Sequence, residues 1–466
     1  MVVVALVAGC TRPNPASCRD GFCSDPAFPF CDVEGTLGGT PGQCLAVECE
    51  ANAFIACNGD DAVTCNADAT NYSVDACPHG CDEATVGCRT CAVNSDCAAT
   101  TPVCDLARDE CRACAADDEC DSLICNRGQC TNALDVLYVA VNGSATADCS
   151  RASPCALATA LSIATTSASQ RTIRLDAGTY VGGLHVVSPS PHPIVVVGHD
   201  AVLSSSSEAL KVAAGASLEI RRVTVASTDR AIVCGQNGGG ATSTLLMESS
   251  LVRQDDPYAA LVSATNCNLR MTGSELRILD AGASDPIAIN AATDTDFEGD
   301  RLHIHGLRTS MLTLFGQRVH LKLTNSLLEN VEFLDATSDS TIPGSSAFFN
   351  FNTFIVKGSF ACSGTNAPIT LSHNVIFGTS ASNVISSAQQ CDLRRNILLP
   401  QSPTPAGGNL IADPQFVDAA SGNFRLKPTS PAVGAAGIPS GVEHTDHDFT
   451  GAARPQGGAF DIGAFE

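Results

Sequence analysis

A repeat of about 22 residues within positions 322–399 is the feature that most restricts the fold. Each repeat contains an alternating apolar pair, then an asparagine, then a second short apolar run. The asparagines are Asn325, Asn352, Asn374 and Asn396, at intervals of 27, 22 and 22 residues. One such unit cannot bury its apolar side chains alone, so successive units must stack as coils of a solenoid. The longer first interval indicates one coil enlarged by an insertion.

Stacked coils of this kind pair their strands in parallel, with about 4.8 Å between neighbouring strands. An asparagine that recurs in the turn can then bond its side-chain amide to the asparagines above and below it. We therefore expect Asn325, Asn352, Asn374 and Asn396 to form a structural ladder. A leucine-rich repeat is the alternative, but it requires a Leu-x-x-Leu-x-Leu-x-x-Asn frame with helical backs, and the Ser/Thr-rich, β-branched runs here do not supply it.

The same frame continues towards the N-terminus with other residues in the asparagine position. It can be followed through Gly273, Ser249 and Arg222 to two strands that end near Gly178 and Gly198. This predicts an all-β solenoid of about ten coils, on the order of 50 Å long at the spacing of paired strands.

Residues 137–466 resemble a right-handed parallel β-helix of the pectate-lyase-like kind. The segments 137–143 (LYVAVNG) and 173–180 (IRLDAGTY) resemble the N-terminal end of many secreted β-helices. The segments 413–418 (DPQFVD), 423–426 (NFRL) and 461–466 (DIGAFE) resemble the choice-of-anchor Q type of C-terminal region. Gly434 departs from that family, which more often has Asp at this position. The resemblance implies a β-helix over 137–410 and a C-terminal cap over 411–466.

Charge and aromatic content restrict the partners. The chain has 26 Lys and Arg residues against 49 Asp and Glu residues, a formal net charge of −23. This balance argues against nucleic acid or an anionic membrane surface as the main partner, whereas calcium or a cationic partner would fit. With no Trp and four Tyr, stacking platforms for sugar rings are scarce.

The cysteines define a second module. The chain has 25 Cys, 19 of them by position 130, and this density in a polar segment implies disulfides made in an oxidising compartment. We expect a disulfide-rich module of little regular structure over 11–130 and a linker over 131–136. Cys149 and Cys155 are expected to form a further disulfide, followed by a short helix that closes the end of the β-helix.

Residues 1–10 end in Leu-Val-Ala-Gly-Cys, which resembles a bacterial lipobox. The resemblance implies cleavage before Cys10 and lipidation of its thiol, so that the protein would be lipid-anchored in the bacterial envelope, at the outer membrane or cell surface. No basic residue precedes the apolar run, so we expect translation to start upstream. The alternative is a buried strand with a free Cys. No later apolar stretch is long enough to span a bilayer.

A tandem duplication lies within the Cys-rich module. Four cysteines beginning at Cys91 are followed by four more beginning at Cys114, a period of 23 residues. The pattern is similar to the small Cys-rich repeats of secreted proteins, including the Dickkopf-like type. The pair Cys111 and Cys114 could alternatively serve as a zinc or redox motif, although no His lies nearby.

An acidic segment is the main candidate site for chemistry. Its carboxylates alternate before a Gly turn and two histidines, which resembles the start of a calcium loop. In a pectate-lyase-like enzyme such acids hold calcium while a basic residue abstracts a proton, a role that Arg301 or a histidine could take. The alternative is a solvated acidic loop. The candidate metal or groove residues are Asp294, Asp296, Glu298, Asp300, His303 and His305.

Two smaller clusters accompany this segment. His444, Asp446, His447 and Asp448 lie close enough in sequence to bind a transition metal, but a polar loop in the cap is the preferred interpretation. The paired carboxylates Asp255 and Asp256 are interpreted as a turn.

The sequence favours a surface-anchored lipoprotein whose β-helix serves extracellular binding or adhesion, to a polysaccharide or a cell-surface protein. A lyase or glycoside hydrolase acting on acidic polysaccharide is the second hypothesis. A passive structural component of the envelope is the third. Fold resemblance alone cannot decide among them.

Overall fold

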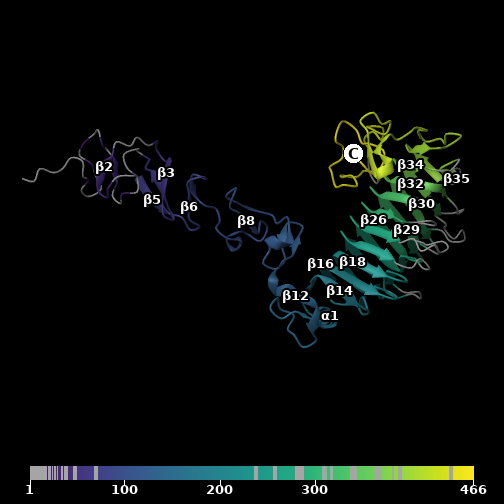
Figure 1. Cartoon of the computed structure of the whole chain (residues 1–466), viewed down its shortest axis with the longest axis horizontal. Coiled ribbons are helices and arrows are strands. Elements are labelled where there is room, and N and C mark those ends of the chain that lie inside the picture. Colours follow the sequence, from purple (N-terminus) through teal and green to yellow (C-terminus); the bar gives the residue numbers. More distant parts are fainter. Residues whose placement is uncertain are drawn as a thin grey trace, which may run out of the picture. The chain divides into compact units, whose positions relative to one another are not determined.

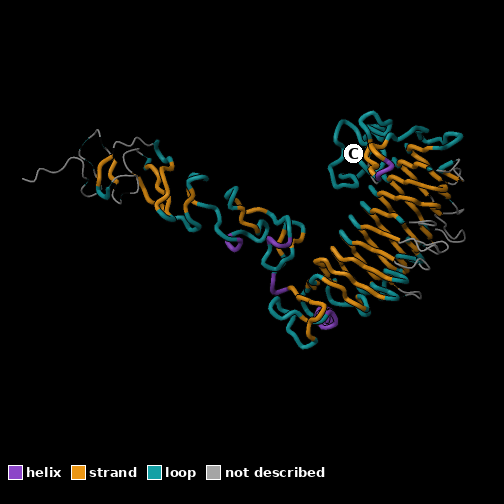
Figure 2. The backbone as a smooth tube through the Cα atoms, viewed as in Figure 1, coloured by secondary structure: helices purple, strands orange, loops and turns teal. Residues whose placement is uncertain are grey.

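The computed structural model describes residues 18, 23, 25, 28, 30–32, 35, 40–45, 50–67, 72–235, 240–254, 260–278, 288–306, 312–314, 318–335, 344–362, 369–379, 383–386, 391–439 and 444–466. The chain divides into two compact units, Met1–Ala133 and Leu134–Glu466. The first unit consists largely of loops with short strands, and the second is dominated by long ranks of strands (Figure 2).

The second unit is a parallel β-helix, in which each coil adds strands beside those of the coil before (Figure 1). Its strands form three faces that alternate along the chain. The first face contains β12 (Val136–Ser144), β13 (Thr172–Leu175), β16 (Ile194–Ser205), β18 (Ser217–Ser227), β20 (Ser243–Glu248), β23 (Cys267–Thr272), β26 (Thr295–Asp300), β29 (Val319–Thr324), β31 (Ser346–Asn350), β33 (Ile369–Ser372) and β36 (Cys391–Arg394).

The second face begins where the chain turns a corner after each first-face strand. It contains β14 (Gly178–Val181), the second halves of β16 and β18, and then β21 (Leu251–Gln254), β24 (Glu275–Ile278), β27 (His303–His305), β30 (Leu327–Asp335), β32 (Thr353–Ala361), β34 (Val375–Gly378) and β37 (Ile397–Leu399). The third face contains β15 (Leu184–Val186), β17 (Leu210–Val212), β19 (Ile232–Gly235), β22 (Val262–Thr265), β25 (Ile289–Ala291) and β28 (Leu312–Leu314). β35 (Ile385–Ser386) pairs with the end of β32.

The interior of the β-helix is one continuous apolar core. Alternate residues of each strand point inward, because successive side chains of a strand lie on opposite sides, and Ile220, Met247, Met271 and Leu323 are examples that are fully or almost fully buried. Because the strands pair in register, equivalent side chains of successive coils stack directly on one another. The expected all-β parallel solenoid is confirmed.

The number of coils differs from the prediction. The structure has about seven regular turns, slightly fewer than the roughly ten that the repeat frame predicted. The frame counted each first-face strand from β13 onward as one coil. In the described part of the chain, however, the third-face sheet ends with β28, so the coils from β29 onward have no strand in that sheet. The segment between β12 and β13 contains the helix α1 (Leu157–Thr166).

A left-handed residue turns the corner between the first and second faces. The residues with positive φ at this corner are Arg222, Ser249, Gly273, Arg301, Asn325, Phe351, His373 and Arg395. The residue that follows each of them is buried, and in the later coils it is an asparagine. Asn352 Nδ2 donates to Asn374 Oδ1 (3.1 Å), Asn374 Nδ2 to Asn396 Oδ1 (3.0 Å), and Asn396 Nδ2 to Asn409 Oδ1 (2.9 Å).

Asn325 does not belong to this ladder. Thr324 pairs with Asn350 and Leu327 with Thr353, so Asn325 lies in register with Phe351, one position before the ladder. The residue in register with Asn352 is Ser326, whose backbone N–H donates to Asn352 Oδ1 (2.9 Å). The ladder instead gains Asn409, which follows the last coil.

The N-terminal end of the β-helix is covered by α1, which lies beside β12 and β13 (Figure 1). Ala160 and Ala164 are the helix residues that are buried, and Leu157 and Leu161 pack against the core with part of their surface exposed. A disulfide joins Cys149 to Cys155 just before the helix.

The C-terminal segment, 411–466, packs along the side of the β-helix. It contains the hairpin of β38 (Phe416–Asp418) and β39 (Asn423–Leu426). A second apolar cluster joins its Phe416, Phe424, Phe460, Ile462 and Phe465 to outward-facing residues of the second face and the corner, namely Leu327, Phe351, Ile355, Val375 and Ile397. The segment therefore covers the outer side of β30, β32, β34 and β37, in addition to following the last coil.

Arg454 links four other residues of the C-terminal segment through hydrogen bonds. Its side chain is 0 % exposed, and its guanidinium bonds Glu466 Oε2 (2.9 Å) and the carbonyls of His447, Asp461 and Gly463. The guanidinium group has five N–H donors in one plane, so it can bond several acceptors at once. The buried charge is therefore paired, and three loop carbonyls that would otherwise be unsatisfied are bonded.

The first unit is held together by disulfides. Every described cysteine of the chain is disulfide-bonded. The strands are short antiparallel pairs or, for β3–β5, a three-stranded sheet: β1 (Phe30–Asp32), β2 (Gln43–Leu45), β3 (Phe54–Asn58), β4 (Asp61–Cys65), β5 (Tyr72–Ala76), β6 (Cys81–Asp82), β7 (Gly87–Cys88), β8 (Val103–Asp105), β9 (Glu110–Arg112), β10 (Cys125–Asn126) and β11 (Gln129–Cys130). Disulfides replace the apolar core that such short elements cannot build.

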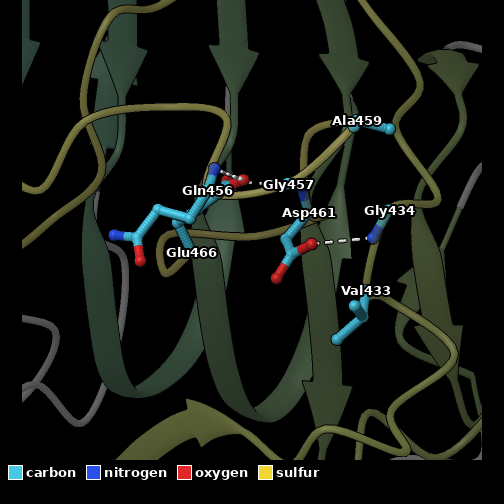
Figure 3. A pocket seen from close by; sticks show the side chains of 8 residues that line it. Val433, Gly434, Gln456, Gly457, Ala459, Asp461 and Glu466 are labelled. Atoms are coloured by element: carbon cyan, nitrogen blue, oxygen red, sulfur yellow. Dashed lines mark hydrogen bonds between the residues drawn. The ribbon is translucent and has the colours of Figure 1, made fainter.

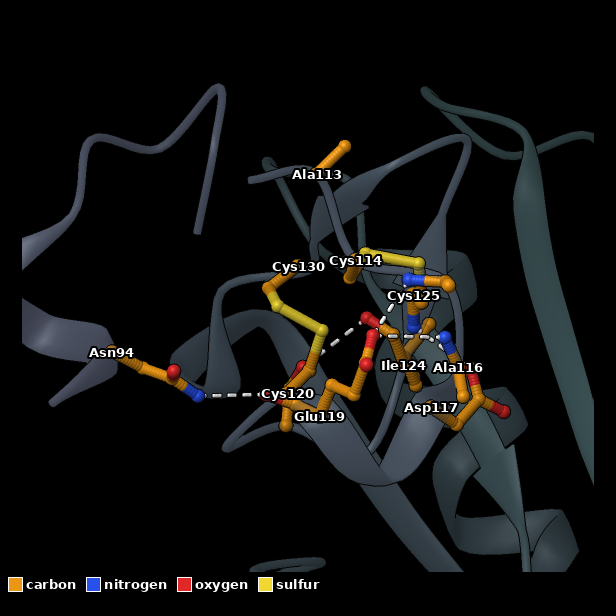
Figure 4. Close-up of a disulfide and its surroundings, with 12 residues drawn as sticks. Asn94, Ala113, Cys114, Ala116, Asp117, Glu119, Cys120, Ile124, Cys125 and Cys130 are labelled. Carbon is orange, nitrogen blue, oxygen red and sulfur yellow. Dashed lines mark hydrogen bonds between the residues drawn. A yellow bond between two sulfur atoms is a disulfide. The ribbon is translucent and has the colours of Figure 1, made fainter. Parts of the chain in front are cut away.

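The tandem repeats share one disulfide pattern, in which the first cysteine pairs with the third and the second with the fourth. The pairs are Cys91–Cys104 and Cys97–Cys111 in the first repeat, and Cys114–Cys125 and Cys120–Cys130 in the second (Figure 4). Cys111 and Cys114 therefore belong to different disulfides, and the alternative of a zinc or redox pair is wrong.

An acidic side chain closes the same loop in both repeats. Asp96 accepts backbone hydrogen bonds from residues 92 and 93, and Glu119 accepts them from residues 115 and 116. Arg112 joins the repeats by bonding Asp105 of the first and Glu119 of the second. The Arg112 guanidinium, followed by the two backbone donors, lowers the pKa of Glu119 to about 2.

The ladder predicts a strong effect of Asn374→Ala. The substitution leaves the Phe349 carbonyl and the Asn352 N–H, both bonded by Asn374, without partners in a buried corner. We expect a loss of about 2–4 kcal/mol in the free energy of unfolding, measured by urea unfolding with the disulfides intact and followed by circular dichroism. Asn268→Ala, on an exposed position of β23, should change it by less than about 0.5 kcal/mol. Equal effects of the two substitutions would show that the ladder is not stabilising.

Candidate functional site

The acidic segment folds into β26 and the turns on either side of it. Because side chains alternate along a strand, Asp296, Glu298 and Asp300 all lie on the outer side of the first face, while Phe297 and Gly299 point into the core. Asp294 precedes the strand at a left-handed residue (φ 58°). The four carboxylates are thus spread along more than one strand length instead of around one point.

Three of these carboxylates have separate cationic partners. Asp294 pairs with Arg318, and Glu298 lies between Arg270 (2.6 Å) and Lys322 (3.4 Å) of the neighbouring coils. Asp300 pairs with the adjacent Arg301 (3.3 Å) and also contacts His447 of the C-terminal segment. In the described part of the chain, the sets of three or more side chains close enough to share a metal ion consist of disulfide-bonded cysteines. The expected calcium loop is therefore not formed by these residues.

Asp300 connects the β-helix to the C-terminal segment. Its Oδ2 lies 2.8 Å from His447 Nε2, and its Oδ1 accepts hydrogen bonds from Thr324 Oγ1 (2.8 Å) and Asn325 Nδ2 (3.0 Å). Burial raises the pKa of the Asp300 carboxyl, but the hydrogen bonds from His447, Asn325 and Thr324 outweigh burial and hold the pKa below its usual value. The carboxylate is therefore ionised when it holds the segment in place.

His303 and His305 form a second cluster on β27, on the outer side of the second face. Their rings stack with centroids 4.4 Å apart. His303 Nε2 lies 2.6 Å from Glu329 Oε1 on β30, and His305 Nε2 lies 2.7 Å from Glu275 Oε1 on β24. Each imidazole is thus held by a carboxylate from a different neighbouring coil.

Glu275 and Glu329 are site residues that the sequence did not single out, and the contact of His447 with Asp300 was also not predicted. The two glutamates lie 30 and 26 residues from their histidines, close to one coil in either direction, so the repeat period was a usable signal for them. His447 lies 147 residues from Asp300 in a segment without the repeat, and no periodic signal relates the two.

The histidines and acids of the C-terminal segment do not form the alternative transition-metal cluster. His444 bonds Asp446 (3.0 Å), whereas His447 turns to Asp300. Asp448 is fully buried and accepts hydrogen bonds from the backbone of residues 450, 452 and 466. These side chains therefore serve the fold of the loop.

A cavity of about 440 Å³ lies in the C-terminal segment (Figure 3). It is lined by Val433, Gly434, Gln456, Gly457, Gly458, Ala459, Asp461 and Glu466. Asp461 Oδ1 accepts the backbone N–H of Gly434 (2.7 Å). Burial, together with the charge of Glu466, raises the pKa of Asp461. Most of the lining is backbone and small side chains, and the acids already serve as acceptors within the loop.

Several expectations lie outside the described residues. These are the lipobox with Cys10 and the pair Asp255 and Asp256. Within the part of the chain that is described, no helix has the length and apolar character needed to cross a membrane.

The comparisons with known proteins give a distant likeness to solved structures. No family model matches the sequence, and no curated protein matches it either. A solved structure described as "Crystal structure of pectate lyase Pel9A" aligns with a TM-score of 0.39 and 14% sequence identity, covering 71% of this chain and 96% of that chain. We transfer no residue role or activity from it.

Asp300→Asn tests the link between the β-helix and the C-terminal segment. A carboxyl whose folded pKa is lowered stabilises the fold above its unfolded pKa, near 3.8, and this contribution disappears as the pH falls through the folded pKa. We expect Asp300→Asn to lose about 1–3 kcal/mol of unfolding free energy at pH 6 and to show a smaller further loss than the wild type between about pH 4 and pH 2.

The measurement is urea unfolding over that pH range, with Asp392→Asn as the matched control. Asp392 is exposed and pairs with the exposed Arg394, so its replacement should leave both values close to the wild type. The same pH profile for Asp300→Asn and the wild type would contradict the assigned role.

Proposed function

We propose that this chain is an exported, lipid-anchored protein whose β-helix binds an extracellular polymer, with an acidic polysaccharide as the preferred class. The observation that carries the proposal is the open outer side of the first face, where polar and charged side chains stand in columns across successive coils. Export rests on the disulfides, which form in an oxidising compartment.

One column consists of charged residues that pair between coils. Arg270, Glu298 and Lys322 lie in register on β23, β26 and β29, and the glutamate bonds both cations. Parallel to it runs a polar column, in which Asn268, Asp296, His320 and Ser346 lie in register. The two columns form a regular surface whose rows repeat at the strand spacing of about 4.8 Å.

A surface of this kind suits an extended polymer better than a small molecule. Small-molecule sites are concave and mostly apolar, whereas these columns belong to one face of a sheet and carry polar groups in each coil. The cations Arg270 and Lys322 can exchange Glu298 for carboxylates of a ligand, which would provide the attraction. The net charge of −23 opposes a polyanion at long range, so the attraction would come from direct contacts with Arg270 and Lys322, within the screening length of about 8 Å.

Arg270→Ala combined with Lys322→Ala tests the proposed surface. We expect the double substitution to weaken binding of an acidic polysaccharide by about tenfold, or about 1.4 kcal/mol, because both cations of the column are lost. The measurement is binding of the oxidised protein to a panel of acidic and neutral polysaccharides, with and without calcium. Lys427→Ala, an exposed cation in the C-terminal segment, is the control and should bind like the wild type.

The same panel separates the other hypotheses. Release of unsaturated oligosaccharides would show that the protein is a lyase. Release of saturated oligosaccharides with new reducing ends would show that it is a hydrolase. Absence of binding to every polysaccharide, together with unchanged cell adhesion in a deletion strain, would contradict the proposal and leave a passive structural role.

Cys10→Ser tests the proposed anchor. In cells fed a radiolabelled fatty acid, the wild type should be labelled and should partition into detergent, because an acylated N-terminus is held by its lipid chains. The Cys10→Ser protein should be unlabelled and partition into the aqueous phase. Measuring export in parallel distinguishes loss of lipid from loss of secretion, and a labelled Cys10→Ser protein would contradict the assignment.

A further inference from the structure

Two arginines of the second face lie side by side on neighbouring strands. Arg253 of β21 is in register with Arg277 of β24, which is in turn in register with His305 of β27. The residues before the two arginines, Val252 and Leu276, are buried in the core, so the arginines point outward. Because neighbouring strands lie about 4.8 Å apart, the two side chains extend next to each other from the same surface.

Neither arginine is neutralised by a carboxylate of the described residues. Within that part of the chain, the structure gives no ion pair or hydrogen bond for either guanidinium. Glu275 lies on the same strand as Arg277 but bonds His305 (2.7 Å) instead. Other arginines of the β-helix do have carboxylate partners, in the pairs Arg174–Asp176, Arg221–Glu219, Arg270–Glu298, Arg318–Asp294 and Arg394–Asp392.

The two guanidinium groups can be reached from solvent. Arg277 is exposed and Arg253 is half-buried. The Nε atom of Arg253 is buried, and no described group accepts a hydrogen bond from it. The inner end of this side chain is therefore packed, while its partial exposure leaves the outer end open. Like charges that face each other on neighbouring strands are destabilising, so an anion that contacts both guanidinium groups would stabilise this part of the sheet.

We propose that Arg253 and Arg277 together bind a tetrahedral oxyanion of the sulfate or phosphate class. One guanidinium already matches both oxygens of a carboxylate, whereas two guanidinium groups can bond the three or more acceptor oxygens of a phosphate group and balance its charge of about −1.5 to −2. This site is independent of the proposed polysaccharide surface, because it lies on the second face and uses none of the residues of the first-face columns.

The experiment is calorimetric titration of the oxidised full chain with sodium sulfate, at a constant ionic strength set with sodium chloride. We expect one sulfate ion per chain. Arg253→Gln and Arg277→Gln should each weaken sulfate binding by about 10- to 100-fold, because each removes a pair of charge-assisted hydrogen bonds. Acetate should bind the wild type about tenfold more weakly than sulfate, because one guanidinium satisfies its two oxygens.

Lysine variants separate hydrogen-bond geometry from charge. Arg253→Lys and Arg277→Lys keep the positive charge, but an ammonium group cannot bond two oxygens in the planar arrangement of a guanidinium. Each should weaken sulfate binding by about tenfold. Arg425→Gln, which removes an exposed arginine of the C-terminal segment, is the matched control and should retain the wild-type affinity.

A second measurement needs no variant. An arginine-specific dicarbonyl reagent is applied to the wild type with and without sulfate, and the modified positions are mapped by mass spectrometry. Bound sulfate should protect Arg253 and Arg277 and leave Arg425 as reactive as before. Circular dichroism and the unfolding temperature establish that each variant in the titration is folded.

Competition distinguishes two sources of the anion. Displacement of sulfate by a sulfated oligosaccharide would support a site for sulfate esters of a polymer. Displacement by inorganic phosphate and not by the oligosaccharide would support a site for a free ion.

The proposal would be overturned by any of four results. These are no saturable sulfate binding by the wild type, unchanged affinity in both glutamine variants, equal affinity for sulfate and acetate, and equal protection of Arg425 from the dicarbonyl reagent. The last of these would show that sulfate acts on arginines in general.

Discussion

Every coil of the β-helix must turn the same buried corner, and the hydrogen bonds at that corner set the register of all the strands. A left-handed residue begins each turn, and the backbone beyond it is cut off from water. In the later coils a buried asparagine supplies hydrogen bonds to this backbone. The side-chain oxygen of Asn374, for example, accepts the backbone N–H of Asn352 in the coil before, and its side-chain NH₂ donates to the backbone carbonyl of Phe349. In the coil before, the hydroxyl of Ser326 accepts the N–H of Leu302. Because the corner is common to all coils, outward side chains also fall into columns, and the His–Glu contacts follow from it.

The repeat could be predicted from the sequence because it expresses a local requirement of each coil. The sequence did not predict correctly which residue of the first of these coils lies in register with the ladder. Asn325 and Ser326 are both polar and both follow the same apolar pair, so the position that satisfies the corner cannot be told from the pattern alone. Asn409 is followed by the apolar Leu410 and Ile411 but has no alternating apolar pair before it and lies only 13 residues after Asn396, so it was also missed.

The acidic segment shows where sequence reasoning fails for a site. Alternating carboxylates suggested convergence on one ion, but alternation on a strand places them in a row. Glu298 then meets the cations of neighbouring coils, Arg270 and Lys322, and Asp294 meets Arg318. The partner of Asp300 comes from a segment with no repeat, and its place depends on tertiary packing. The sequence does contain one indication that the C-terminal segment covers the second face. The runs at 354–356, 375–377 and 397–399 are apolar without alternation, which is expected only when both sides of a strand are covered.

The disulfide pattern of the two Cys-rich repeats bears on how this part of the chain can change. Each 23-residue repeat closes its own two disulfides and bonds its own loop through Asp96 or Glu119. Arg112 and the side chain of Asn94 form hydrogen bonds from the first repeat to the second. A gene duplication or deletion of one unit would therefore leave the remaining thiol pairings undisturbed. The reach of this region can be adjusted by copy number, at little risk of mispaired cysteines during oxidative folding.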